Sequence, residues 1–390
     1  NITQHRCIFT ERIEQAGAIV IGKTNSPVMG FRGTCDNYLF GPSQNPFCPT
    51  KNTGGSSGGA AAAVADGMLP LAEGTDGGGS IRIPASWCGV YGYKAAYGRI
   101  PSLSRPNAFA SETPFSFSGP ITRTVEDAAL ALNALAGYHP RDPYSIDDDT
   151  DFLPAVTRSI RDWKIAYSPD LDVFPVDPRV SKVVEAQVKA FEEEGANIEE
   201  VKIGIGRPQQ ELSDLWCRLI IPRNITTLEA VKVSGPDLLG EHHHDFPAEY
   251  LRWIRVGQHL SAVDFYKDQE IRTEIYDAIQ SVLNDYDLLV TPTLACLPVD
   301  NSNDGNTLGP SEINGEPVDP LIGWCLTYLF NFTGHPAASI PAGLSEDGLP
   351  VGMQIIGRRY ADADVLAASA AFERLRPWQE SYRQCTERVF

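Results

Sequence analysis

Two glycine-rich loops, each built around a serine, place the strongest constraint on how this chain can fold. Ser56 lies in the run GGSSGG at residues 54–59, and Ser80 lies in GTDGGGSIRIP at residues 74–84. Glycine weakens helices and strands alike and is used where the backbone must bend or approach another group closely. Neither loop can therefore be the interior of a regular element, and we interpret both as parts of a functional site.

The loop that ends at Ser80 has the composition of an oxyanion-binding turn. The backbone N–H groups of Gly77, Gly78, Gly79 and Ser80 can point into one concavity beside a nucleophilic hydroxyl. Ser80 is therefore the candidate nucleophile, and the three glycines are candidate substrate-binding residues.

Ser56 precedes residues 60–64, a run of small, helix-favouring side chains that predicts a buried helix directly behind the serine. Ser56 would then point from the start of that helix into the same cavity as Ser80. The nearest histidines are His5 and His139, so a Ser-His-Asp triad has no local support. Another group must accept the proton of the nucleophile.

Residues 54–99 resemble the signature sequence of the amidase signature family, and matching motifs occur upstream and downstream. These motifs are Thr24-Asn25, Asn37, Gly41, Asn45-Pro46, Pro292, Gly334, Pro341-Ala342-Gly343 and the run GLPVG at 348–352. The resemblance implies that Ser80 is the nucleophile and that Ser56, after a cis Gly55-Ser56 peptide bond, is the bridging serine. It also implies an oxyanion hole at 77–80, with the two hydroxyls within hydrogen-bonding distance.

The family's catalytic lysine has no counterpart among the numbered residues. Only Lys23 and Lys51 precede Ser56, and both match positions that are not catalytic in the family. The resemblance therefore implies a lysine upstream of Asn1. We expect residues 1–390 to form one amidase domain without the N-terminal segment that carries this base.

The order of predicted elements is typical of an α/β fold. Capping residues and hydrophobic patterns predict helices at 9–17, 124–136, 178–194 and 364–376, and a mainly helical region over 209–281. Strands are predicted at 18–21, 68–74, 163–167, 197–201 and 288–291, with a hairpin formed by 338–342 and 350–357. The resemblance implies a single large domain with a central mixed, twisted β-sheet covered by helices on both faces.

Composition excludes several classes of function. A net charge of −18 and a pI near 4.8 oppose binding to nucleic acid or to an anionic membrane surface. Eight cysteines without a C-x-x-C pair give neither a disulfide framework nor a zinc pattern, which favours a cytoplasmic protein. No apolar run reaches the roughly 18 residues that a membrane span needs. No cofactor or metal is expected, and a homodimer is possible.

Residues near position 30 bear on substrate choice. By the resemblance, Gly30 and Phe31 lie on the segment that faces the nucleophile, and Val28 occupies a position that is acidic in many relatives. An apolar wall favours a small-molecule amide with an apolar or aryl part.

Two further groups of residues have interpretations of their own. The aromatic residues between 209 and 281 are interpreted as core. Asp76 and Arg82 either pair to lock the Ser80 loop or are separate solvated charges.

Three functions remain compatible with these residues. The first is an amide hydrolase acting on a small molecule, with esters and carbamates as further substrates. The second is the A subunit of a tRNA-dependent amidotransferase, which usually has Gln at the position of Ile83. The third is a binding protein that keeps the amidase fold without catalysis.

Overall fold

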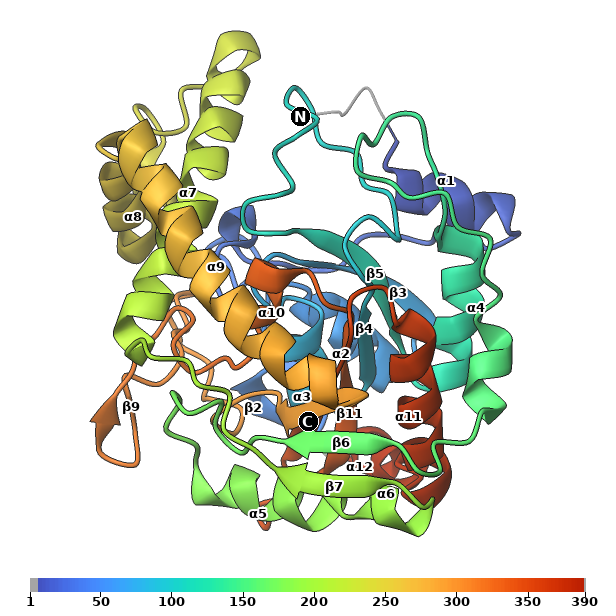
Figure 1. Ribbon diagram of the computed structural model, residues 1–390. Helices are drawn as coiled ribbons and strands as arrows, with labels where there is room; N and C mark the ends of the chain where they lie inside the picture. Colours follow the sequence, from blue (N-terminus) through green and yellow to red (C-terminus); the bar gives the residue numbers. More distant parts are fainter. Residues whose placement is uncertain (1–5, 389–390) are drawn as a thin grey trace.

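The computed structural model describes residues 6–388, and an eight-stranded mixed sheet forms its centre (Figure 1). The strand order is β3-β5-β4-β11-β12-β8-β6-β7. The bounds are β3 Leu71–Asp76, β4 Tyr91–Lys94, β5 Phe117–Thr122, β6 Lys164–Tyr167, β7 Asn197–Glu200, β8 Leu288–Pro292, β11 Ala337–Leu344 and β12 Pro350–Gly357. Neighbours from β3 to β8 are antiparallel, whereas β6 pairs with β8 and β7 in parallel.

Two hydrophobic clusters cover opposite faces of this sheet. Successive strand residues point to opposite faces, and Leu288 belongs to one cluster while Leu289 belongs to the other. The first cluster contains residues of α2 (Gly58–Ala65), α4 (Val125–Leu135), α5 (Pro178–Val188) and α11 (Asp362–Leu375). The second contains residues of α7 (Gln209–Ser234), α8 (Ala248–Gln258) and α9 (Ala262–Asp285). The predicted mixed sheet with helices on both faces is confirmed.

Short elements connect these layers. They are α1 Ile8–Gln15, η1 Val28–Gly30, β1 Gln44–Asn45, β2 Cys48–Asn52, α3 Arg82–Trp87, η2 Leu153–Thr157, α6 Ala190–Glu193, η3 His243–Asp245, β9 Glu312–Ile313, β10 Glu316–Pro317, α10 Leu329–Thr333, η4 Gln379–Tyr382 and α12 Arg383–Thr386. In Figure 1 the long helix α9 crosses in front of the central strands, while α4 and α11 lie together at one side. Between residues 6 and 388, no helix is both long enough and apolar enough to cross a membrane.

Local capping signals predicted several elements correctly. The Thr124 side chain accepts a hydrogen bond from the Asp127 N–H at the start of α4, and the Asp177 side chain caps α5 in the same way. The hairpin of β11 and β12 turns at Gly348, whose φ of 73° lies in the left-handed region that suits glycine. These elements are confirmed because each has a signal within a few residues of its end.

The predicted strand at 18–21 is wrong. This apolar segment is irregular, and Ile19 and Ile21 are 86% and 73% exposed. An apolar run becomes a strand only where a neighbouring strand can pair with its backbone. Within the described part of the chain, no strand lies beside it.

Candidate active site

The two serine loops lie side by side at the ends of neighbouring elements. The loop of Ser80 joins β3 to α3, and the loop of Ser56 joins β2 to α2. The Ser57 N–H donates to the Ser80 carbonyl at 3.2 Å, and Ser57 Oγ bonds both the N–H and the carbonyl of Thr75 in β3. Ser57 therefore fixes one loop against the other.

The peptide bond between Gly55 and Ser56 is cis, as the resemblance implied. The hydrogen bond expected between the Ser56 and Ser80 hydroxyls is not formed, and within residues 6–388 neither hydroxyl has a hydrogen-bonded partner. Catalytic hydrogen bonds are often loose before substrate binds and tighten in the complex. Both hydroxyls are therefore free to bond a substrate or a base.

The carbonyl groups of the glycine loop are held outward by groups from distant parts of the chain. Trp216 Nε1 donates to the Gly77 carbonyl at 2.9 Å, and Thr327 Oγ1 donates to the Gly78 carbonyl at 2.6 Å. The Gly79 carbonyl accepts from the Ile83 N–H in α3 at 2.6 Å. A trans peptide points its N–H opposite to its C=O. The N–H groups of Gly78 and Ser80 therefore face away from these donors.

Close packing explains why this loop is glycine. A Cβ on Gly78 would lie 2.6 Å from Trp216 Nε1, and a Cβ on Gly79 would lie 2.0 Å from Thr327 Oγ1. Gly79 also has a φ of 130°, in the region that side chains rarely adopt. Any side chain here would displace the groups that orient the loop.

Asp76 and Arg82 pair beneath the loop, both fully buried. Arg82 Nε and one terminal nitrogen donate to the two Asp76 oxygens, each at 2.9 Å. Asp76 also accepts the Gly79 N–H at 2.7 Å and the Ile81 N–H at 3.3 Å. Burial alone would raise the pKa of Asp76, but the charge and hydrogen bonds of Arg82 outweigh it and lower the pKa. The predicted pairing of Asp76 with Arg82 is confirmed, and the alternative of two separate solvated charges is wrong. The locking role stays a prediction.

The carboxylate of Asp76 is expected to dominate the stability of this region. Asp76→Asn should lower the free energy of unfolding by about 3 to 5 kcal/mol, because it leaves the buried Arg82 charge uncompensated. Urea unfolding at neutral pH would measure the change. Asp300→Asn is the matched control, because Asp300 pairs with Lys51 while 75% exposed and such pairs contribute about 0 to 1 kcal/mol. Equal losses in the two variants would contradict the locking role.

An aromatic wall adjoins the two serines. A Cβ on Gly30 would lie 3.4 Å from Ser56 Oγ, which places Gly30 against the bridging serine. The next residue, Phe31, packs edge-on to Tyr250 with ring centroids 4.7 Å apart, and lies 6.2 Å from Trp216. Trp216 and Tyr250 were interpreted only as core. Both are buried in the second hydrophobic cluster, as predicted, but Trp216 also bonds the glycine loop, and nothing in its local sequence indicates that contact.

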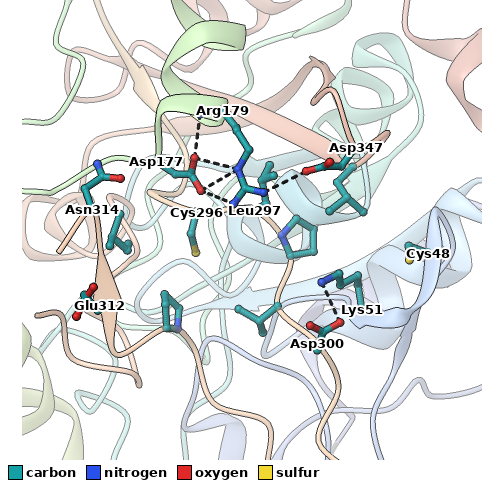
Figure 2. Close-up of a pocket in the computed structure, with 15 residues that line it drawn as sticks. Cys48, Lys51, Asp177, Arg179, Cys296, Leu297, Asp300, Glu312, Asn314 and Asp347 are labelled. Atoms are coloured by element: carbon teal, nitrogen blue, oxygen red, sulfur yellow. Dashed lines mark hydrogen bonds and ion pairs between the residues drawn. The ribbon is translucent and has the colours of Figure 1, made fainter. Parts of the chain in front are cut away.

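Lys51 does not face the serines. Its Nζ pairs with Asp300 at 2.8 Å on the rim of a separate cavity of about 510 Å³ (Figure 2). Across that cavity Arg179 is paired with Asp177 and Asp347, and neither serine is among the lining residues. Lys23 is exposed. Both lysines therefore lie outside the catalytic site, as predicted from the sequence.

Lys94 and His335 are buried titratable groups that the sequence analysis did not single out. Lys94 Nζ donates to the His335 carbonyl and lies 4.0 Å from the centre of the Phe117 ring. Burial lowers the pKa of Lys94, and the neighbouring Arg82 lowers it further. The His335 ring bonds Thr333 and Gln280. Neither group contacts Ser56 or Ser80, so neither completes a catalytic triad in the described structure.

His335 should make stability fall at acid pH. Burial first, and then the positive charge of Lys94, lower its pKa to about 3, so the folded protein keeps it neutral while the unfolded chain binds a proton below about pH 6.5. The stabilisation is complete above pH 6.5 and is lost between about pH 6.5 and 3. His335→Gln should reduce the slope of unfolding free energy against pH by up to about 1.4 kcal/mol per pH unit.

Urea unfolding between pH 7 and 4.5 would measure this slope. The exposed His259 offers a matched control for the substitution itself, made as His259→Gln. Identical slopes for wild type and His335→Gln would refute the assignment.

Among residues 6–388, no group of three His, Cys, Asp or Glu side chains could hold a metal ion.

Comparison with known proteins agrees with this geometry. A model of the amidase family matches residues 1–366. An acylamidase of Rhodococcus erythropolis is 38% identical over 386 residues, which cover 97% of this chain and 77% of that protein. The A subunit of a glutamyl-tRNA(Gln) amidotransferase of Moorella thermoacetica is 35% identical over 381 residues, covering 93% and 75%.

The structural comparison points the same way. The crystal structure of a bacterial aryl acylamidase superposes with a TM-score of 0.97 and 48% identity, covering 99% of this chain and 79% of that one. The chain belongs to the amidase signature family. The predicted class of enzyme, a serine hydrolase that cleaves amide C–N bonds, is confirmed.

Proposed function

We propose that this chain hydrolyses a small-molecule amide with an apolar or aryl part, through an acyl-enzyme on Ser80. The observation that carries the proposal is the loop at 77–80. Its carbonyls bond Trp216, Thr327 and Ile83, so the N–H groups of Gly78 and Ser80 face the other way, and the Ser80 hydroxyl has no hydrogen-bonded partner within residues 6–388. Such fixed donors stabilise the oxyanion of acyl transfer.

In the proposed reaction, Ser80 Oγ attacks the amide carbonyl and its proton passes to Ser56. The carbonyl oxygen takes up the electron pair as an oxyanion, which the N–H groups of Gly77, Gly78 and Ser80 stabilise. The Gly79 N–H already bonds Asp76, so it serves the loop and not the substrate. Collapse of the oxyanion breaks the C–N bond, and the proton returns through Ser56 to the departing amine. Water then releases the acyl group by the same relay.

The proposed base at the far end of this relay is a neutral lysine outside the described residues, as the family resemblance implies. Lys51 pairs with Asp300, and Lys94 is bonded to the His335 carbonyl. These contacts favour a base outside the described residues. The described residues supply both serines and the proposed oxyanion hole.

The apolar or aryl preference rests on the wall beside the serines. Phe31, Trp216 and Tyr250 pack together behind Gly30 and the glycine loop, and the structure with the TM-score of 0.97 is described as an aryl acylamidase. Ile83, fully buried behind Gly54, differs from the Gln usual in the amidotransferase subunit, so the hydrolase is favoured. The cytoplasmic location and the homodimer stay predictions.

A hydrolysis panel tests the proposal. The full-length protein would be given 4-nitroanilides with aryl and short alkyl acyl groups, the matching esters and carbamates, and glutamine. Release of 4-nitroaniline without release of ammonia from glutamine would support it. Hydrolysis of glutamine alone would favour the amidotransferase subunit, and no turnover together with no labelling of Ser80 by a fluorophosphonate would favour a non-catalytic protein.

A further inference from the structure

We propose that Arg223 recognises a carboxylate on the substrate, so that the preferred amides carry an anionic group as well as an apolar or aryl part. This inference rests on the proposed function and narrows its substrate class. The inference rests on Arg223, which lies beside the glycine loop and whose guanidinium makes one hydrogen bond within residues 6–388.

Arg223 belongs to the face of α7 that lines the catalytic loop. Trp216, Ile220 and Arg223 are spaced four and three residues apart and therefore share one side of the helix. Trp216 bonds the Gly77 carbonyl, and Ile220 lies 3.8 Å from the Cβ position of Gly77. This face of α7 thus follows the oxyanion loop over two helical turns.

The guanidinium group of Arg223 reaches the same loop through Ser116. One terminal nitrogen donates to Ser116 Oγ at 2.8 Å, and that oxygen lies 3.4 Å from the Cβ position of Gly77. A guanidinium has five N–H donors in a planar fork. Within residues 6–388 this is the only hydrogen bond that the Arg223 guanidinium makes, so most of its N–H donors have no protein partner.

Arg223 also has no carboxylate partner among the described residues, although it is partly buried. Burial lowers its pKa, and only the Tyr97 hydroxyl opposes that effect. Other buried arginines make several hydrogen bonds or pair with a carboxylate. The Arg272 guanidinium, for example, donates to the Phe332 and Glu112 carbonyls and to Gln269. Asp76 pairs with Arg82, Asp36 with Arg32, Asp362 with Arg99 and Asp268 with Arg218.

A carboxylate fits the unused donors of Arg223 best. Arginine binds carboxylates through two parallel N–H···O bonds, and such charge-assisted bonds are stronger than neutral ones. A partly desolvated cation without a counter-ion gains further from an anionic ligand. The strongly acidic protein opposes ligands of high negative charge, which favours a single carboxylate.

Two pairs of substrates that differ by one carboxylate test the proposal. On the acyl side, N-succinyl-4-nitroaniline is compared with N-butyryl-4-nitroaniline, and on the amine side 4-acetamidobenzoate is compared with acetanilide. Wild type should prefer the charged member of at least one pair. Arg223→Gln should lower kcat/KM for that member by about 10- to 100-fold, mainly through KM, and change the neutral member less than threefold.

Arg223→Lys should recover part of the preference, because the positive charge is kept. The exposed Arg255 provides the control, and Arg255→Gln, which removes the same charge elsewhere, should leave the ratio unchanged. An equal fall on charged and neutral substrates would show that Arg223 only supports the loop through Ser116, and would overturn the proposal. So would a wild type that cleaves the charged and neutral members of both pairs equally well.

Binding separates this inference from the proposed function. In the Ser80→Ala background, calorimetry should show that N-succinyl-4-nitroaniline binds more tightly than its butyryl analogue, and that adding Arg223→Gln removes the difference. That result would support Arg223 even if wild type cleaves neither compound, in which case the proposed function alone fails. Equal affinities in the two backgrounds would overturn the role of Arg223 whatever the activity.

Discussion

Ser80→Ala should abolish amide hydrolysis, with a loss in kcat of at least about 10⁴-fold, because it removes the hydroxyl that forms the acyl-enzyme. Turnover of a 4-nitroanilide and covalent labelling by a fluorophosphonate would measure the effect, and both should disappear. The Ser80 hydroxyl has no hydrogen-bonded partner within residues 6–388. The free energy of unfolding should therefore change by less than about 1 kcal/mol.

The unfolding measurement is the control that separates a loss of chemistry from a loss of folding. A folded Ser80→Ala protein without turnover assigns the hydroxyl to chemistry. Labelling that persists in this variant would place the nucleophile elsewhere, and peptide mapping of the adduct would locate it.

Ser56→Ala should lower kcat by about 10² to 10⁴-fold, because the proton of Ser80 would lose its path to the base and the departing amine would lose its acid. Fluorophosphonate labelling of Ser80 should become slower but should still reach completion, since the nucleophile is intact. Anilides should suffer more than activated esters, whose leaving groups need no proton. Parallel rates on an anilide and on the matching 4-nitrophenyl ester would measure this difference.

Ser57→Ala is the matched control for Ser56, because the adjacent serine has a purely packing role. Its hydroxyl bonds the N–H and carbonyl of Thr75, so its removal should lower the free energy of unfolding by about 1 to 3 kcal/mol and affect esters and anilides equally. If Ser56→Ala showed this uniform pattern instead, Ser56 would be a structural residue and the relay would need another member.

The parts of the fold that could be predicted from sequence are those with local signals. Thr124 and Asp127 cap α4 within one helical turn, and Gly348 turns a hairpin between two strands. The two serine loops were likewise recognisable, because glycine density is a local property. The segment at 18–21 had a local signal too, but strand formation depends on a partner elsewhere in the chain.

The parts of the site that could not be predicted depend on contacts between distant residues. Trp216 lies 139 residues from Gly77, and Arg223 lies 107 residues from Ser116. In the sequence both residues belong to a helical pattern, which does not show what each side of the helix will contact. Hydrophobic spacing therefore favoured a core role for Trp216 and indicated no role for Arg223. Only the path of α7 past the glycine loop brings Trp216 to Gly77 and Arg223 to Ser116.

The order of strands in the sheet has a consequence for synthesis on the ribosome. β11 and β12 are the last strands to be translated, yet they lie between β4 and β8 and join the two earlier groups of strands. Thr327, Asn331 and Gln354, which bond Arg82 or Asp76 under the nucleophile loop, are also made late. A nascent chain that ends before β12 therefore carries both serines but not all the residues that hold the nucleophile loop in place, so hydrolytic activity should emerge only after β12 has been made.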